Sequence, residues 1–442
     1  MKYLVVGARV AGAASALALH RLGHQVRVVD QHSADPALAE AGIEVIIGDP
    51  EPSQLLSGVD EVVLSPGIPP HHPLPVAALA KGLDVYSEPE LAWRLRGPDA
   101  PIWLGITGTN GKTTTTTMLA SILRAAGLRT AALGNIGVPL VDAQTGYDVL
   151  AVELSSFQLH WSSTLAPQGG AMLNLADDHL DWHGGFDEYA KAKTAIWRGG
   201  VAVGNLDDPR VAEALEHAPG RKIGFTLGVP PPGCVGVVED LLIDRINPGD
   251  AFELANVADI KPSGAHNVAN ALAASALALS IGVSHEAIRA GLTDYVPEPH
   301  RNAPVATVND VSYVDDSKAT NPHAALASLL AYPRIVWVAG GQLKGVDIDD
   351  LVARIAPRLA GAVVLGIDRA QVLEALSRHA PRLPVVEVSR TDDGAMGEVV
   401  SAAARMAMPG DTVLLAPAAA SLDMFASYAH RGDAFASAVR GL

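Results

Sequence analysis

The feature that constrains this chain most is a pattern that recurs along it: a short apolar run, a glycine turn and an Ala/Leu-rich segment. The apolar runs are continuous rather than alternating, which is typical of strands that are covered on both faces. Strands that alternate with helices favour a mostly parallel sheet, so we predict an α/β fold. No repeat of solenoid length is visible in the sequence.

Two segments rich in proline divide these units into three groups, at residues 96–101 and 296–299. A chain of 442 residues is expected to hold roughly three domains. We predict a Rossmann-like domain at 1–97, a P-loop-type mononucleotide-binding domain at 98–297 and a Rossmann-like domain at 298–442. One predicted strand begins at residue 102. The other predicted strands cover residues 2–6, 25–29, 43–47, 61–64, 83–86, 149–152, 171–174, 311–314, 335–339, 362–366, 385–388 and 412–415.

The charge balance argues against several classes of partner. There are 32 basic and 48 acidic residues, which gives a net charge of −16. A binder of nucleic acid or of an anionic membrane needs a basic face, so we expect neither. The single cysteine excludes an internal disulfide, and no signal-peptide apolar region follows Met1. The longest uncharged stretch, 268–284, contains Asn270 and reads as a buried helix. We expect a soluble cytoplasmic monomer.

The strongest motif is G-I-T-G-T-N-G-K-T-T at residues 105–114, between a predicted strand and a predicted helix. Glycines let backbone N–H groups surround a phosphate, and the helix N-terminus adds a positive dipole. We expect Lys112 to meet the outer phosphates and Thr113 to ligate Mg²⁺. The spacing differs from the usual phosphate loop, because Ile106 lies five positions before Gly111. The predicted ATP site comprises Gly108, Thr109, Asn110, Gly111, Lys112, Thr113 and Thr114.

Two candidate metal ligands follow the next predicted strands. Glu153 ends an apolar strand, and ligands bind at that edge of a parallel sheet, so we favour a Mg²⁺ ligand over a solvent-facing acid. His179 lies in a segment with three aspartates and two histidines in residues 177–183. His179 as a second Mg²⁺ ligand would be unusual, since Mg²⁺ prefers oxygen. That this segment is only a polar loop with a capping aspartate is an equal alternative.

Lys193 shares a helix face with Tyr189, Ile196 and Trp197. A lysine in an apolar stripe either extends its amine to solvent, which is the commoner case, or is buried with a lowered pKa. A neutral buried amine is chemically able to react with CO₂.

The first glycine loop, Gly7 to Gly12, is similar to a dinucleotide fingerprint, with Asp30 at a strand end. Arg9 replaces the middle glycine, which weakens a redox NAD site and leaves a ligand site and a structural turn equally open. Near the C-terminus, loops rich in charge and hydroxyls follow the predicted strands. Four of the nine lysines, at 112, 193, 318 and 344, fall in candidate sites, which favours anion handling.

Together these motifs resemble the Mur ligase family over essentially the whole chain. T-G-T-N-G-K-T-T at 107–114 marks the family broadly. Further motifs narrow the resemblance to the members that add D-glutamate: Gly134-Asn135-Ile136-Gly137, E-L-S-S-F-Q-L at 153–159, the stretch 316–322, and Ser421-Leu422-Asp423 with Arg431-Gly432.

The resemblance implies an ATP-dependent ligase of cytoplasmic peptidoglycan precursor synthesis, and hence a role in cell shape and cell division. ATP would phosphorylate the terminal carboxylate of UDP-N-acetylmuramoyl-L-alanine, and the amine of D-glutamate would attack the acyl phosphate. Phosphoryl transfer needs positioning and charge neutralisation rather than a protein nucleophile, which agrees with the motifs.

The resemblance also implies a role for each matching residue. Lys112, His179 and Lys193 would be catalytic. Thr113 and Glu153 would hold one Mg²⁺, and His179 with a carbamylated Lys193 would hold the second. The other implied contacts are Asn270, Arg301, Asp316 and Lys318 for ATP; Gly7, Gly12, Asp30, Gly67 and Asn135 for the UDP substrate; and Thr320, Lys344, Ser421 and Leu422 for D-glutamate. Arg9 departs from the family pattern, because it stands where glycine is expected, and we predict that it contacts the diphosphate of the UDP substrate itself.

Two alternatives remain open at this point. A folylpolyglutamate-type ligase would keep the ATP machinery but not a Rossmann-like N-terminal domain of this kind. A non-catalytic nucleotide-binding regulatory module would explain both glycine loops but not the lysines at 193, 318 and 344.

Overall fold

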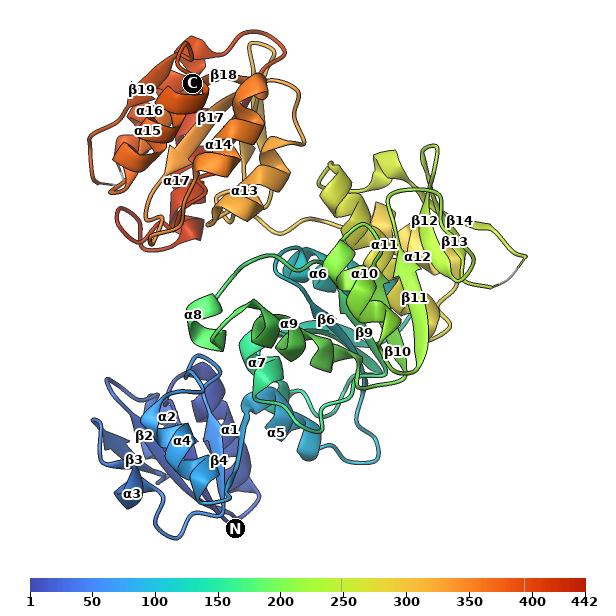
Figure 1. Ribbon diagram of the computed structural model, residues 1–442, viewed down its shortest axis with the longest axis vertical. Coiled ribbons are helices and arrows are strands. Elements are labelled where there is room, and N and C mark those ends of the chain that lie inside the picture. Colours follow the sequence, from blue (N-terminus) through green and yellow to red (C-terminus); the bar gives the residue numbers. More distant parts are fainter. Residues whose placement is uncertain (248, 393) are drawn as a thin grey trace. The chain divides into compact units, whose positions relative to one another are not determined.

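The computed structural model describes residues 1–247, 249–392 and 394–442 (Figure 1). Within these residues the chain forms three sheets, with helices packed beside them. The chain separates into two compact units. The first comprises Met1–Ile260 and Val268–Tyr295, and the second comprises Lys261–Asn267 and Val296–Leu442. The predicted α/β class is confirmed.

The first sheet, drawn in blue in Figure 1, pairs its strands in parallel. Their order is β3 (Glu44–Ile47), β2 (Gln25–Asp30), β1 (Lys2–Val6), β4 (Glu61–Leu64) and β5 (Asp84–Ser87). The helices of this region are α1 (Val10–Arg21), α2 (Pro36–Glu40), α3 (Pro52–Leu55), α4 (Pro73–Ala80) and α5 (Glu88–Arg94). The strand order reverses at β1, and ligands of such sheets bind at the carboxyl ends beside that point.

The second sheet belongs to the same unit. Its order is β14 (Phe252–Asn256), β13 (Leu241–Arg245), β12 (Cys234–Val238), β11 (Arg221–Phe225), β10 (Val201–Asn205), β9 (Gly169–Met172), β6 (Ile102–Thr107), β8 (Val149–Glu153) and β7 (Thr130–Gly134). The pairs β12–β13 and β13–β14 are antiparallel, and the other pairs are parallel. The loops after β7, β8, β6 and β9 therefore leave one edge of this sheet.

The helices that accompany the second sheet are α6 (Lys112–Ala125), α7 (Ser156–His160), α8 (Leu180–His183), α9 (Phe186–Thr194), α10 (Pro209–Glu216), α11 (Ala265–Ser280) and α12 (His285–Thr293), with 3-10 turns at Leu140–Asp142, Ala195–Trp197 and Val257–Asp259. The uncharged stretch 268–284, predicted to be a buried helix, lies in α11 as far as Ser280. Leu272 and Leu277 on α11 have no exposed surface and pack in one core with Leu104 of β6. No helix in the described part of the chain is long and apolar enough to cross a membrane.

The third sheet lies in the second unit. Its order is β15 (Ala303–Val308), β16 (Val311–Asp315), β20 (Thr412–Leu415), β17 (Ile335–Gly340), β18 (Leu359–Leu365) and β19 (Val385–Glu387). Only β15 pairs antiparallel within the described residues. Its helices are α13 (Pro322–Leu329), α14 (Asp349–Ile355), α15 (Arg369–His379), α16 (Ala395–Met406) and α17 (Tyr428–Arg440), with a 3-10 turn at Ala356–Arg358.

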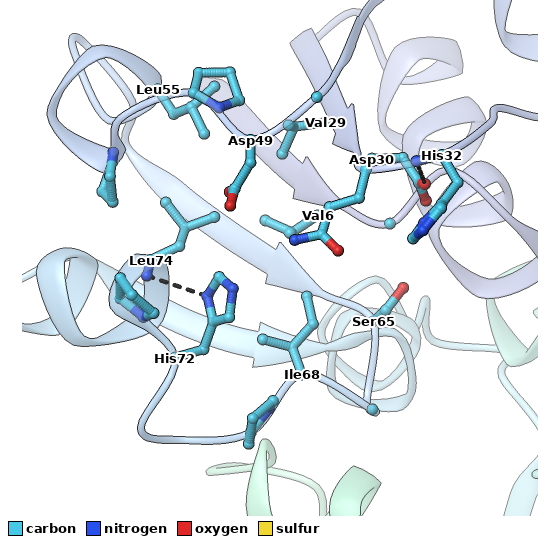
Figure 2. A pocket seen from close by; sticks show the side chains of 18 of the residues that line it. Val6, Val29, Asp30, His32, Asp49, Leu55, Ser65, Ile68, His72 and Leu74 are labelled. Carbon is cyan, nitrogen blue, oxygen red and sulfur yellow. Dashed lines mark hydrogen bonds between the residues drawn. The ribbon is translucent and has the colours of Figure 1, made fainter.

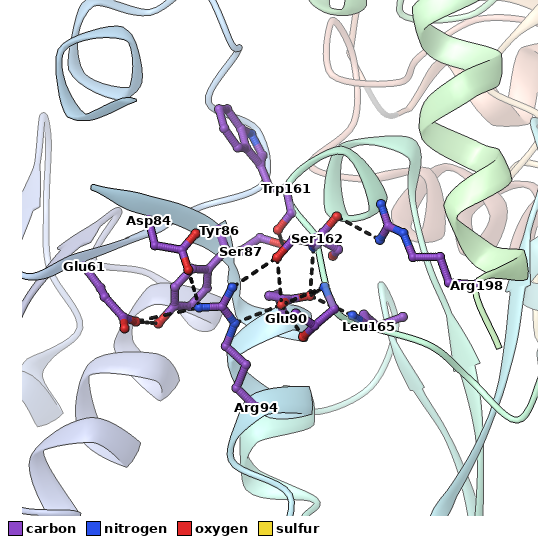
Figure 3. A network of polar contacts seen from close by, with 12 residues as sticks. Glu61, Asp84, Tyr86, Ser87, Glu90, Arg94, Trp161, Ser162, Leu165 and Arg198 are labelled. Atoms are coloured by element: carbon purple, nitrogen blue, oxygen red, sulfur yellow. Dashed lines mark hydrogen bonds and ion pairs between the residues drawn. The ribbon is translucent and has the colours of Figure 1, made fainter. Parts of the chain in front are cut away.

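A buried carboxylate joins the first sheet's region to the second sheet within the first unit (Figure 3). Glu90 on α5 accepts hydrogen bonds from the backbone N–H groups of Ser163, Thr164 and Leu165, at 3.0–3.1 Å. Arg94 donates to the same carboxylate (2.8 Å) and pairs with Asp84 (2.6 Å). Burial alone would raise the pKa of Glu90, but these hydrogen bonds outweigh it and lower that pKa.

A neighbouring carboxyl gives a stability prediction. Glu88 is buried, and the Val141 N–H donates to its Oε1 (2.8 Å). Burial raises the pKa of Glu88 from 4.5 to about 7, so between these values the folded chain keeps a proton that the unfolded chain loses. We therefore expect the free energy of unfolding to fall as the pH rises from 4.5 to about 7, by about 3 kcal/mol from this group.

Denaturant unfolding at a series of pH values would measure this effect. Glu88→Gln should remove that part of the pH slope, and the exposed Glu40→Gln should keep it. Equal slopes for the wild type and Glu88→Gln would show that Glu88 is not the group responsible.

Candidate active site

The glycine-rich loop between β6 and α6 depends on a close backbone approach. Gly111 has a φ of +83°, and a Cβ added there would meet Asn270 Oδ1 at 2.4 Å. Only glycine adopts this conformation at little cost, and Asn270 lies directly against the loop. Helix α6 starts at Lys112, so its first N–H groups and the positive end of its dipole lie at the loop. The predicted strand, loop and helix are all present.

Hydrogen bonds from the next strand end hold this loop. Asn174 Oδ1 accepts from the Asn110 N–H (2.8 Å), and Asn174 Nδ2 donates to the Asn110 carbonyl (3.1 Å). The Thr109 hydroxyl lies 2.7 Å from the Tyr189 hydroxyl and accepts from the Ala176 N–H (3.0 Å). A loop ordered in this way loses little entropy when a ligand binds.

Two lysine amines converge on one carbonyl of the loop. Lys112 Nζ donates to the carbonyls of Gly108 and Thr109, both at 2.9 Å, and Lys193 Nζ donates to Gly108 O at 2.8 Å. Lys193 is 2% exposed. Burial lowers the pKa of Lys193 well below its ordinary value, and the nearby charge of Lys112 lowers it further. The alternative in which the Lys193 amine extends to solvent is therefore wrong.

Glu153, the last residue of β8, is a buried carboxylate beside this loop. Its Oε1 accepts from Asn135 Nδ2 (2.9 Å), and its main-chain carbonyl accepts from the Asn135 N–H (2.9 Å). Its Oε2 is buried and has no hydrogen-bond partner among the described residues. An unpaired buried carboxylate oxygen is costly, so this position suits a cation. Glu153 and the hydroxyl of Thr113 supply the oxygen atoms that Mg²⁺ prefers, so these residues fit the ion.

A cavity of about 310 Å³ opens beside the loop and brings several predicted residues together. Those residues are Lys112, Asn135, His179, Lys193 and Gly67. The remaining lining residues are Pro66, Ser155, Ser156, Phe157, Asp178 and Tyr189. Because the lining combines two lysines with loops from both sheets of the first unit, the cavity suits the reacting end of an anionic substrate.

His179 borders this cavity with an exposed side chain and a left-handed backbone, at φ +53°. Its ring centroid lies 4.7 Å from that of Phe157, and its Nε2 lies 3.5 Å from Asp178 Oδ2. In the part of the chain that the structure describes, no group of three His, Cys, Asp or Glu residues is placed to hold a metal. The second Mg²⁺ site at His179 and Lys193 therefore stays a prediction.

A larger cavity of about 730 Å³ lies at the carboxyl edge of the first sheet (Figure 2). Its lining includes four of the residues predicted to contact the UDP substrate, namely Gly7, Arg9, Asp30 and Gly67. Gly12 does not belong to the described lining. A Cβ on Gly12 would meet the Gly7 carbonyl at 1.8 Å, so in this structure Gly12 allows α1 to pack closely against the loop.

Asp30 organises the rim of this larger cavity. Its Oδ2 accepts from the Ala8 N–H (2.8 Å), and its Oδ1 accepts from the N–H groups of His32 (2.9 Å) and Ser33 (3.3 Å). Burial alone would raise the pKa of Asp30, but these hydrogen bonds lower it. The carboxylate therefore stays charged and fixes the loops after β1 and β2.

In the second unit, three loops leave one edge of the third sheet, because β16, β20 and β17 are parallel neighbours. Arg431 on α17 joins them. It donates to the hydroxyl and the carbonyl of Ser317 (both 2.9 Å) and to the carbonyls of Ala419 (3.1 Å) and Gly340 (3.5 Å). Burial lowers the pKa of Arg431 to about 10, which leaves it charged at neutral pH. Its motif was visible in the sequence, but its role was not.

The predicted ATP residues of this unit lie near the β16 end. Asp316 is buried and accepts from the Asn302 N–H (3.0 Å) and the Ser328 hydroxyl. Burial raises the pKa of Asp316 to about 7. Arg301 pairs with Glu298 (3.0 Å). The amine of Lys318 lies 3.9 Å from the centre of the Tyr428 ring.

The predicted D-glutamate residues lie on the three neighbouring loops. Lys344 follows β17 with a left-handed backbone, at φ +54°. A bridge between Gln342 and Ala420 joins its loop to the one that carries Ser421 and Leu422. The Ala418 N–H donates to the Ala319 carbonyl (3.0 Å), which brings the Thr320 loop alongside. Ser421 is buried and Leu422 is exposed.

Family models match this chain along most of its length. Residues 1–87 match the Mur ligase MurD-like N-terminal domain, residues 106–278 the Mur ligase middle domain, and residues 300–419 the Mur ligase glutamate ligase domain. The chain belongs to the Mur ligase family. The resemblance seen in the motifs is therefore confirmed.

Relatives of this Mur ligase match it from end to end. The UDP-N-acetylmuramoylalanine–D-glutamate ligase of Thermobifida fusca is 54% identical over an alignment 457 positions long, which covers 99% of this chain and 98% of the relative. The protein of the same name from Streptomyces avermitilis is 53% identical over 459 residues (99% and 97%). That of Nocardia farcinica is 47% identical over 465 residues (99% and 96%).

Solved structures establish the fold of this Mur ligase. MurF from Acinetobacter baumannii aligns with a TM-score of 0.62 at 20% identity, covering 99% of this chain and 90% of that one. A pseudomurein peptide ligase type C from Methanothermus fervidus aligns with a TM-score of 0.60 at 21% identity, covering 94% and 96%. The predicted α/β architecture with three Mur ligase domains is confirmed.

Proposed function

We propose that this Mur ligase uses ATP to join D-glutamate to UDP-N-acetylmuramoyl-L-alanine in peptidoglycan precursor synthesis. The observation that carries this proposal is the end-to-end identity of 47–54% to relatives that bear the name of that enzyme. The site supports it, because Lys112 and Lys193 line one cavity beside the glycine-rich loop. Asn135 lines the same cavity and donates a hydrogen bond to the buried carboxylate of Glu153.

The reaction has two steps. A carboxylate oxygen of the substrate forms a bond to the γ-phosphorus of ATP as the bond to the bridging β–γ oxygen breaks, giving an acyl phosphate and ADP. The amine of D-glutamate then attacks the acyl carbon. Phosphate leaves with that carboxylate oxygen, the amide forms and a proton is released. Charge neutralisation and positioning supply most of the catalysis in such transfers.

The ATP end of the site is assigned to the loop and its neighbours. Lys112 and the first N–H groups of α6 meet the outer phosphates, and Asn270 lies against the loop. Thr113 and Glu153 would hold Mg²⁺. A bound Mg²⁺ would neutralise the charge that develops on the transferring group. Arg301, Asp316 and Lys318 are proposed to bind the rest of the nucleotide.

Lys193 is proposed to become carbamylated. Its nitrogen forms a bond to the carbon of CO₂ and loses a proton, which leaves an anionic carbamate with two oxygen ligands. The support is its burial, its lowered pKa and its position on the Gly108 carbonyl. With His179, this group would hold a second Mg²⁺.

The UDP substrate is proposed to extend through both cavities, since Gly67 lines each of them. The larger cavity accommodates the nucleoside diphosphate, near Arg9 and the loop that begins at Gly7. The smaller cavity receives the carboxylate end, near Asn135 and the two lysines.

Lys344 is proposed to pair with a carboxylate of D-glutamate, beside Thr320, Ser421 and Leu422. Lys344→Ala should raise the KM for D-glutamate by about 10- to 100-fold, because a charged hydrogen bond is lost. The KM for ATP should stay near the wild-type value. The control is Lys81→Ala at an exposed position, which should leave both KM values unchanged. Steady-state kinetics with each substrate varied would measure both. An unchanged KM for D-glutamate would remove Lys344 from the pocket.

Phosphate release from ATP tests the proposed function. The assay contains UDP-N-acetylmuramoyl-L-alanine and one amino acid from a panel that includes both glutamate enantiomers. We expect phosphate release only when the amino acid is D-glutamate. Release that needs no amino acid would contradict the proposal. A second assay supplies a folate in place of the UDP substrate, and release there with L-glutamate would favour the folylpolyglutamate-type alternative.

A further inference from the structure

Two tryptophans from loops of the second sheet hold one backbone segment of the first sheet's region. The segment is residues 65–69, which follow β4. Trp161, directly after α7, donates its indole N–H to the Ile68 carbonyl (3.1 Å). Trp182, in α8, donates its indole N–H to the Gly67 carbonyl (3.0 Å). Two consecutive carbonyls are therefore fixed by side chains about a hundred residues away in the sequence.

Packing reinforces these hydrogen bonds. Trp161 is 5% exposed and belongs to a hydrophobic cluster with Leu4 and Leu74 of the first sheet's region, and Ile68 and Trp182 pack against that cluster. The ring of His160 lies edge-on to both indoles, with ring centroids 4.9 and 5.2 Å apart. Both indoles are held in place on several sides, so their N–H groups have defined directions.

The segment that they hold forms a wall of both cavities. Ser65, Gly67, Ile68 and Pro69 line the larger cavity, and Pro66 and Gly67 line the smaller one. The indoles themselves belong to neither described lining. Their influence on a ligand would therefore pass through the backbone of residues 65–69.

We propose that Trp161 and Trp182 are positioning residues that set the path of the UDP substrate from the larger cavity to the smaller one. This inference rests on the proposed function, in which the diphosphate and the reacting carboxylate occupy different cavities. A shift of the segment would misplace the carboxylate relative to the phosphate loop, and small misplacements of reacting groups reduce turnover strongly.

Trp182→Phe and Trp161→Phe test the proposal, because each keeps an aromatic ring and removes the indole N–H. Each should raise the KM and the Kd for UDP-N-acetylmuramoyl-L-alanine by about 3- to 10-fold, as the loss of one hydrogen bond predicts. The KM values for ATP and D-glutamate should stay within about 2-fold. The Kd for UDP alone should rise less than that for the whole substrate, because UDP does not reach the smaller cavity.

Trp197→Phe is the matched control. Its indole N–H also donates to backbone carbonyls, those of Gly170 (3.1 Å) and Val203 (3.2 Å), but it lies in the core of the second sheet. It should lower the melting temperature and leave the KM for the UDP substrate unchanged. Trp182 is only half-buried, so Trp182→Phe keeps the test decisive where Trp161→Phe does not fold.

The outcomes separate this inference from the proposed function. If the wild-type enzyme does not ligate D-glutamate, the proposed function is overturned, and the inference with it. An active wild type whose Trp182→Phe variant keeps its KM and Kd for the UDP substrate would overturn the inference alone. Equal rises in all three KM values would indicate a merely structural role and would also overturn it.

Discussion

Replacing Lys193 with alanine is expected to abolish ligation, with kcat lower by about 1,000-fold or more. The amine is buried against the Gly108 carbonyl of the phosphate loop and has a lowered pKa. Alanine retains neither the amine nor the carbamate that it would form. Added bicarbonate should therefore not restore the variant, as measured by phosphate release.

Lys191→Ala is the matched control for this prediction. Lys191 lies on the same helix but is exposed and pairs with Glu188 (3.6 Å), so its loss should leave kcat near the wild-type value. For the wild type, buffer depleted of CO₂ should lower the activity, and bicarbonate should restore it. Near-normal activity of Lys193→Ala would show that the buried amine has no part in the reaction.

Lys112→Met should lower kcat/KM for ATP by about 1,000-fold, because one charged group of the phosphate loop is lost. Lys112 Nζ lies over the loop, within 2.9 Å of the carbonyls of Gly108 and Thr109, and methionine keeps its length without the charge. Steady-state kinetics with ATP varied would measure the loss. The exposed Lys222→Met should keep wild-type kinetics, and a loss below about 10-fold for Lys112→Met would contradict the assignment.

Much of this fold could be predicted from local sequence signals. The apolar runs at 2–6, 61–64 and 412–415 match β1, β4 and β20 residue for residue, and the loop from Gly108 to Gly111 lies between β6 and α6 as expected. The run predicted at 171–174 is shifted, because β9 covers Gly169–Met172. A Cβ on Gly170 would meet the Ile196 carbonyl at 2.1 Å, so packing requires a glycine that carries no β-strand signal.

The remaining features depend on tertiary contacts that local patterns do not encode. The buried amine of Lys193 donates a hydrogen bond to the Gly108 carbonyl, which is 85 residues away in the sequence. The hydrogen bonds of Glu90 reach residues 73–75 positions away. The bonds of Arg431 to Ser317 span 114 positions. A resemblance identified several of these residues, but only the fold shows what each one contacts.

Oxygen-18 transfer tests the central claim most directly. The substrate carries the label in the carboxylate of its L-alanine, and the enzyme turns it over with ATP and D-glutamate. Mass spectrometry of the released phosphate should find one labelled oxygen per molecule, with the other retained in the amide, because the carboxylate attacks the γ-phosphorus. Label in AMP or in water, with none in the phosphate, would contradict an acyl phosphate and the mechanism assigned to this site.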